Sequence, residues 1–153
     1  MSVRVQLEER YWYPDDGGIV WVAGYHLVDD QGSFIGRDDP RLAERGLRVS
    51  GVAGAGRHHG DALQGDVGPG TVLELRRDRE NEHDANAIAV DAPGGAMLGF
   101  VPRAVAEELA PALDDGSPWA AVVLREQRAS PRDPRTGLTM LLAEGDAIEL
   151  EVE

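Results

Sequence analysis

Residues 76–86 hold the densest group of side chains in this sequence that could do chemistry. Arginines, carboxylates, amides and one imidazole follow one another there almost without a break. Acids and a histidine this close together could hold a divalent cation in a hydrolytic site, and the candidate ligands are Asp78, Glu80, His83 and Asp84. The interleaved arginines could instead neutralise these acids. They could also bind phosphate through the planar donor fork of the guanidinium group.

The segments on either side must position this group. Residues 71–75 and 87–90 are dominated by β-branched and aliphatic side chains, which is typical of strands. A polar segment between two strands is either an exposed turn or a recognition loop on a rigid sheet. Asn81, Asp84 and Asn86 are common turn residues, and Asn86 directly precedes the second strand, where a structural role suits it best.

Short strand-like runs also make up most of the remaining chain. Further strands are expected at residues 3–7, 19–27, 47–53, 97–101, 119–124, 138–143 and 147–152. The connections should be a turn at residues 11–18, a linker or short helix at residues 37–46 and a glycine-rich loop at residues 54–60. This pattern predicts a mainly β fold, a small antiparallel or mixed β-barrel.

One helix is expected, at residues 102–113. Pro102 suits the first helical position, and Ala106, Leu109 and Leu113 follow at helical spacing. Pro111 should kink or shorten its last turn, because proline cannot donate the backbone hydrogen bond. The helix is expected to close one end of the barrel.

Composition limits the class of protein. At 153 residues the chain suits one domain, or one domain with an extension, and no apolar run approaches the roughly 20 residues of a membrane helix. The sequence has no cysteine, which excludes disulfides, thiolate zinc sites and cysteine nucleophiles and fits a reducing cytoplasm. The first residues have no apolar signal core. We therefore expect a cytoplasmic protein that does not enter the membrane.

The charge argues against tight, non-specific binding along nucleic acid. The net charge is −13, although all fifteen basic residues are arginine. The charge is uneven, because residues 47–103 carry six arginines against eight acids and are nearly balanced. Weak or structure-specific binding to nucleic acid in that part of the chain stays compatible with the sequence.

No catalytic residue, cofactor or metal is expected. The glycine-rich segment 51–56 lacks the spacing of a Rossmann loop and the Gly-Lys-Ser/Thr of a P-loop. His58, His59 and Asp61 have no further ligand at a helpful spacing, so a solvated loop is the better interpretation. No nucleophile and base can be paired from the sequence.

Residues 77–90 read Arg-Asp-Arg-Glu-Asn-Glu-His-Asp-Ala-Asn-Ala-Ile-Ala-Val, and residues 98–103 read Leu-Gly-Phe-Val-Pro-Arg. These two motifs resemble the HIRAN domain, which occurs at the N-terminus of fork-remodelling SNF2-type helicases and as a stand-alone bacterial protein. The likeness covers about residues 47 to 125. It implies an OB-like barrel of about six strands, closed by the helix near residues 102–114. We expect residues 1–46 to be an N-terminal extension of unknown role and residues 47–153 to form the barrel domain.

The resemblance also implies binding of single-stranded DNA at a free 3′ end. Asp84 would accept a hydrogen bond from the terminal 3′-hydroxyl, and Arg103 would contact phosphate. Asn81 would line the terminal pocket, and His83 would offer a partial stacking face where the family has a tyrosine. The remaining candidates for nucleic-acid binding are Arg77, Phe100 and Arg57.

This sequence departs from the family at three further positions. Ala53 and Gly54 stand where DNA-binding members carry a basic residue and a tyrosine, and Leu138 stands near a late aromatic position. Stacking contributes roughly 1–3 kcal/mol per base, so the affinity should be reduced.

The leading hypothesis is a non-catalytic domain that recognises 3′ ends of single-stranded DNA, in DNA repair or replication-fork processing. A protein-protein interaction module with the same fold is the alternative, and a metal-dependent nuclease or other hydrolase is the third.

Overall fold

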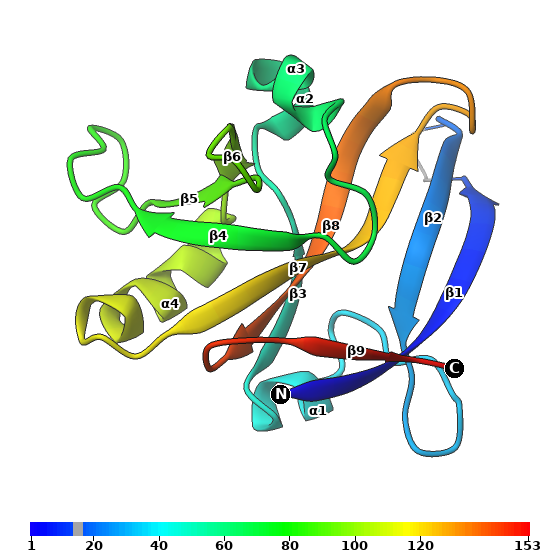
Figure 1. Ribbon diagram of the computed structural model, residues 1–153, viewed down its shortest axis with the longest axis horizontal. Helices are drawn as coiled ribbons and strands as arrows, with labels where there is room; N and C mark the ends of the chain where they lie inside the picture. The colour runs from blue at the N-terminus through cyan, green and yellow to red at the C-terminus, as the bar shows by residue number, and fades with distance from the viewer. Residues whose placement is uncertain (14–16) are drawn as a thin grey trace.

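The computed structural model describes residues 1–13 and 17–153, and the described residues form nine strands and four helices (Figure 1). The strands are β1 Ser2–Trp12, β2 Val20–Leu27, β3 Leu47–Gly51, β4 Val72–Arg77, β5 Ile88–Asp91, β6 Met97–Phe100, β7 Trp119–Arg128, β8 Arg135–Glu144 and β9 Glu149–Val152. The helices are α1 Pro40–Glu44, α2 Ala55–His58, α3 Gly60–Leu63 and α4 Arg103–Asp114. The prediction of a mainly β fold is confirmed.

The antiparallel hairpin of β7 and β8 lies at the centre of the molecule and is buried on both faces. Side chains alternate along a strand, so Ala121 and Val123 pack into one hydrophobic core, whereas Val122 and Leu124 pack into a second. The first core fills the space enclosed by β3 to β8 and α4. The second core lies on the outer face of the hairpin.

The sheet around the first core curls toward a barrel. Strands pair in the order β3, β8, β7, β4, β5 and β6, all antiparallel. The two ends of this series meet at one bridge, where Ala53 and Phe100 exchange backbone hydrogen bonds of 2.8 and 2.9 Å. Within the described part of the chain no continuous ladder joins β3 to β6, so the barrel stays open apart from this bridge.

Glycine is required where the bridge forms. A Cβ on Gly99 would lie 2.3 Å from the carbonyl oxygen of Ala53 and 3.0 Å from Cγ1 of Val52. The backbone of Gly99 also has a φ of +156°. Strand β6 can therefore approach Ala53 only because position 99 has no side chain.

Residues 1–46 extend the same sheet on its other side. Strand β2 pairs with β1 and with β7, and β1 pairs in parallel with β9 (Figure 1). Apolar side chains from this segment form much of the second core: Val3, Val5, Leu27 and Leu42. The segment therefore covers the outer face of the central hairpin. Strand β1 runs through Trp12, where the sequence predicted a turn, because Trp12 still pairs with Val20; residues 14–16 of that turn lie outside the described residues.

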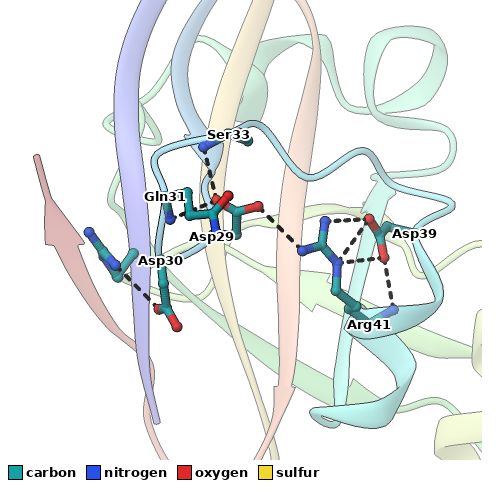
Figure 2. A network of polar contacts seen from close by, with 7 residues as sticks. Asp29, Asp30, Gln31, Ser33, Asp39 and Arg41 are labelled. Carbon is teal, nitrogen blue, oxygen red and sulfur yellow. Dashed lines mark hydrogen bonds and ion pairs between the residues drawn. The ribbon is translucent and has the colours of Figure 1, made fainter.

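A short loop joins β2 to α1 and is fixed by two aspartates (Figure 2). Asp29 accepts hydrogen bonds from the backbone N–H groups of Gln31 and Ser33, at 2.9 and 3.0 Å, and these bonds lower its pKa. Asp39 caps α1 by accepting from the N–H of Arg41 at 2.9 Å. The Arg41 side chain lies between the two carboxylates and bonds to both, so the ends of the loop are tied together.

The helices differ in part from the prediction. The helix expected at residues 102–113 forms as α4, and the short helix that was one of two alternatives for residues 37–46 forms as α1, whereas residues 54–60, predicted as a loop, enter α2 and α3. Helices of four residues are too short to show helical spacing, and buried Ala55 and Leu63 hold them against the first core. Helix α4 continues past Pro111 to Asp114, so the proline lies inside the helix and about one turn follows it.

Candidate functional site

The polar loop between β4 and β5, residues 78–87, is folded by its own side chains. The Asn81 side-chain oxygen accepts from the backbone N–H groups of His83 and Asp84, at 2.9 and 3.1 Å. The Asn81 amide nitrogen donates to Asp78 at 3.2 Å. Asp84 Oδ1 accepts from the N–H of Asn86 at 2.9 Å. The loop therefore has a defined shape, and these short polar side chains act as turn residues.

Asp84 keeps one carboxylate oxygen accessible. Its side chain is 20% exposed, and Oδ1 is occupied by the bond from Asn86. Oδ2 faces Nε of Arg103 at 3.8 Å, which is longer than a hydrogen bond. The Arg103 side chain is 71% exposed and donates to the His83 carbonyl at 3.1 Å. Asp84 is thus neither sealed in the core nor closed off by a tight ion pair.

A pocket with a volume of about 280 Å³ opens beside this carboxylate. Its wall is formed by the loop 78–87, the end of β6, the start of α4 and Ala53. The lining residues are Ala53, Asn81, His83, Asp84, Ala87, Phe100, Val101 and Arg103. Five residues selected from the sequence therefore meet at one place: Asn81, His83, Asp84, Phe100 and Arg103.

The pocket also contains residues that the sequence did not indicate. Ala87 and Val101 provide part of an apolar wall, and their types carry no chemical signature. Ala53 and Phe100 are the two partners of the bridge between the barrel ends. The pocket is therefore built directly on that bridge. Chemically, it combines an apolar wall with one acceptor oxygen and one exposed guanidinium group.

Arg77 lies elsewhere and holds the loop in place. Its side chain is 13% exposed and donates to both carboxylate oxygens of Asp114, at 3.0 and 3.2 Å. It also donates to the carbonyl groups of Ala87 and Ala85, at 2.8 and 3.0 Å. The hydrogen bonds from Arg77, and then from Arg79, hold the pKa of Asp114 below its usual value. Arg77 thus fastens the loop to the end of α4 and does not line the pocket.

The remaining binding candidate, Arg57, lies in α2, and its side chain is outside the described part of the structure. Among the residues described, no three His, Asp or Glu side chains gather closely enough to hold a metal ion. Several of the arginines pair with acids outside the loop, as Arg76 does with Asp91 at 2.8 Å. In the described residues, no helix has both the length and the apolar character needed to cross a membrane.

Comparison with known proteins gives one family. The family model of the HIRAN domain matches residues 47–142. The HIRAN domain of human HLTF, known from a crystal structure, shares 24% sequence identity with this chain. The match covers 66% of this chain and 78% of the HLTF chain, with a TM-score of 0.48. A protein from Lactobacillus plantarum, also known from a crystal structure, shares 23% sequence identity. The match covers 65% of this chain and 100% of the Lactobacillus plantarum chain, with a TM-score of 0.47. No curated protein matches the chain.

Proposed function

The chain belongs to the HIRAN domain family, and we propose that it is a non-catalytic protein that binds single-stranded DNA at a free 3′ end. One observation carries the proposal. The pocket beside Asp84 brings five of the candidate residues together around a single accessible carboxylate oxygen. Nucleic-acid repair or fork processing is the context that the family resemblance implies for such a protein.

The Asp84 carboxylate would read the chemical state of the DNA end. An ionised carboxylate only accepts hydrogen bonds, so Oδ2 can pair with a 3′-hydroxyl and would repel a 3′-phosphate. The turn that fixes Oδ1 on the N–H of Asn86 keeps the other oxygen directed for this contact. The loop is already folded around it, so little ordering is needed when the DNA end enters.

Arg103 and Phe100 would hold the rest of the terminal nucleotide. The exposed Arg103 guanidinium group can donate to the phosphate that precedes the last sugar. Phe100 and the apolar wall offer a surface for the sugar or base, with His83 at the rim. The net charge of −13 opposes this contact at long range, so we expect weak and strongly salt-dependent binding.

Binding of fluorescently labelled oligonucleotides tests the proposal. Two strands of the same sequence, one with a 3′-hydroxyl and one with a 3′-phosphate, are titrated with protein at low and moderate salt, and anisotropy is measured. The hydroxyl strand is expected to bind about tenfold more tightly, the value of one hydrogen bond to a charged group. Equal affinity for the two strands would rule out end recognition. Strand shortening with Mg²⁺ or Mn²⁺ would point to a nuclease.

Introducing a basic residue at Ala53 should strengthen binding. Ala53 is exposed, lines the pocket, and stands where DNA-binding members of the family carry a basic residue. The A53R variant is expected to bind both strands several-fold more tightly at low salt. The slope of log affinity against log salt should steepen by about 0.7, the value for one added phosphate contact on a single strand. An A53Q control, of similar length without charge, should leave the slope unchanged.

A protein-interaction module is the alternative, and exposed apolar side chains favour it. Tyr11, Tyr13 and Ile19 are 47%, 68% and 54% exposed on either side of the connection between β1 and β2. Surface aromatic residues are common at protein interfaces. Lack of affinity for both strands, together with a polypeptide ligand whose binding is lost in a Tyr13→Ser variant, would support this alternative.

A further inference from the structure

A second pocket lies where β1 and β2 meet β7, outside the first core. Its volume is about 490 Å³. Arg10 and Trp12 come from β1, His26 from β2, Arg37 from the loop before α1, and Arg125 from β7. Among the described residues, no Asp or Glu lines this pocket. It shares no lining residue with the pocket beside Asp84.

The arginines of this pocket are paired differently from most others in the chain. In the part of the chain that the structure describes, neither Arg37 nor Arg125 forms an ion pair, whereas Glu8 beside the pocket pairs with Arg10 at 3.4 Å and lies 3.4 Å from His26. Elsewhere, the arginines that pair with carboxylates are Arg4, Arg41, Arg48, Arg76, Arg77, Arg79, Arg103, Arg128 and Arg135. Within the described residues, Arg37 and Arg125 therefore bring two guanidinium groups without an ion pair to one hollow, in a chain with a net charge of −13.

Arg125 shows the effect of this crowding. Burial, and then repulsion by Arg37 and Arg10, lower the pKa of its guanidinium group to about 10. The pKa of His26 is also lowered, by burial and then by Arg125. Like charges that are held together in a partly dry site gain most from an anion that enters it. Holding these charges together therefore carries an electrostatic cost that a bound anion would remove.

The backbone holds Arg125 in this position. A bulge between Val123 and Arg125 shifts the register of β7 on β8, and bulges often redirect a side chain. Gly24 of β2 pairs with Arg125, and a Cβ on Gly24 would lie 2.1 Å from the carbonyl oxygen of Leu124. Nη1 of Arg125 also donates to the carbonyl of Tyr25 at 2.9 Å. The guanidinium group is thus anchored on one side and keeps its other donors for a ligand.

The remaining groups also come from ordered segments. Arg37 lies in the loop whose ends are tied by Asp29, Asp39 and Arg41 (Figure 2). Trp12 still belongs to β1, where it pairs with Val20, and its side chain is 52% exposed. A half-exposed indole beside arginine forks is suited to a ligand that carries both a π-system and an anion.

We propose that this arginine pocket binds the phosphate group of a nucleotide, with Trp12 as a stacking face for the base. Guanidinium forks match phosphate oxygens, and Arg125 and Arg37 approach the ligand from opposite segments of the chain. The phosphate can belong to a free mononucleotide or to the backbone of an oligonucleotide. Thr139 of this pocket pairs with Gly51, two residues before Ala53 of the other pocket, so the two pockets lie on neighbouring strands.

Direct binding of defined probes tests the proposal. Adenosine 5′-monophosphate, ribose 5-phosphate and a 3′-phosphorylated oligonucleotide are titrated at low salt by calorimetry. R37Q and R125Q are each expected to weaken binding of the phosphate probes about tenfold, in line with one charge-assisted contact. The control is R45Q, an exposed arginine without an ion pair among the described residues, and it should bind like the wild type.

The outcomes separate the ligand sources and the role of Trp12. Binding of adenosine monophosphate that R37Q weakens identifies a mononucleotide site, whereas an effect on the oligonucleotide alone identifies its backbone. A W12A variant should bind adenosine monophosphate no better than ribose 5-phosphate. Equal affinity of D84N and the wild type for adenosine monophosphate shows that this site is independent of 3′-end recognition. Two results would overturn the proposal. One is that the protein binds none of the three probes, and the other is that R37Q, which changes only an exposed side chain, binds them as the wild type does.

Discussion

Replacing Asp84 by asparagine is expected to abolish the preference for a 3′-hydroxyl over a 3′-phosphate. Asparagine can still accept the bond from the N–H of Asn86 through its oxygen, so the turn should stay folded. It has no negative charge to repel a phosphate, and its amide group faces the ligand where Oδ2 stood. The affinity for the hydroxyl strand should fall about tenfold, because a hydrogen bond to a charged group contributes about 1.5–3 kcal/mol.

The same change at Glu82 is the matched control. Glu82 lies in the same loop, is exposed and does not line the pocket. E82Q removes one negative charge, as D84N does, so any general effect of charge on DNA binding appears in both variants. Anisotropy with the two strands then isolates the contribution of Asp84. An unchanged preference in D84N, or an equal loss in E82Q, would contradict the assignment of Asp84 as the group that reads the DNA end.

Replacing Gly99 by alanine is expected to cause the largest loss of stability. The added methyl group would lie 2.3 Å from the Ala53 carbonyl oxygen, and neither backbone segment can turn away as a flexible side chain could. The variant must break the bridge between Ala53 and Phe100 or shift β6. We expect a loss of about 3 kcal/mol, which corresponds to a decrease in Tm of roughly 6–12 °C for a protein of this size.

Thermal unfolding with a glycine control checks this result. A Cβ on Gly36 would meet no atom within 4 Å, and Gly36 has no positive φ, so G36A should unfold within about 2 °C of the wild type. Since Ala53 and Phe100 both line the pocket beside Asp84, G99A should also lose binding of the 3′ end at temperatures where it is folded. A Tm of G99A equal to that of the wild type would show that the bridge does not depend on glycine.

The sequence predicted the residues of the pocket beside Asp84 better than the contacts of the elements around it. Asn81, His83 and Asp84 lie in one loop between paired strands, so their proximity follows from local chain geometry. Phe100 and Arg103 join them because β6 pairs with β5, a short hairpin that turn residues revealed. These relationships involve neighbouring segments, and strand and turn patterns are sufficient to find them.

Long-range relationships could not be read from residue types. Arg77 is the last residue of β4 and directly precedes Asp78, yet its direction toward Asp114 depends on where α4 packs. The arginine pocket joins Arg10, Arg37 and Arg125, which lie far apart along the chain and have no motif in common. Strand β7 also pairs with both β2 and β4, and periodicity does not reveal a strand with two partners along one edge.

The parallel pairing of β1 with β9 sets an order for folding on the ribosome. Ser2 pairs with Glu149, so β1 is synthesised well before the strand that covers this edge. Contacts of such high sequence separation form slowly, because the intervening chain must first become compact. We expect the curled sheet of β3 to β8 to assemble before this pairing is complete. Until β9 is synthesised, the nascent chain therefore exposes the unpaired backbone edge of β1, where another strand could pair and cause aggregation.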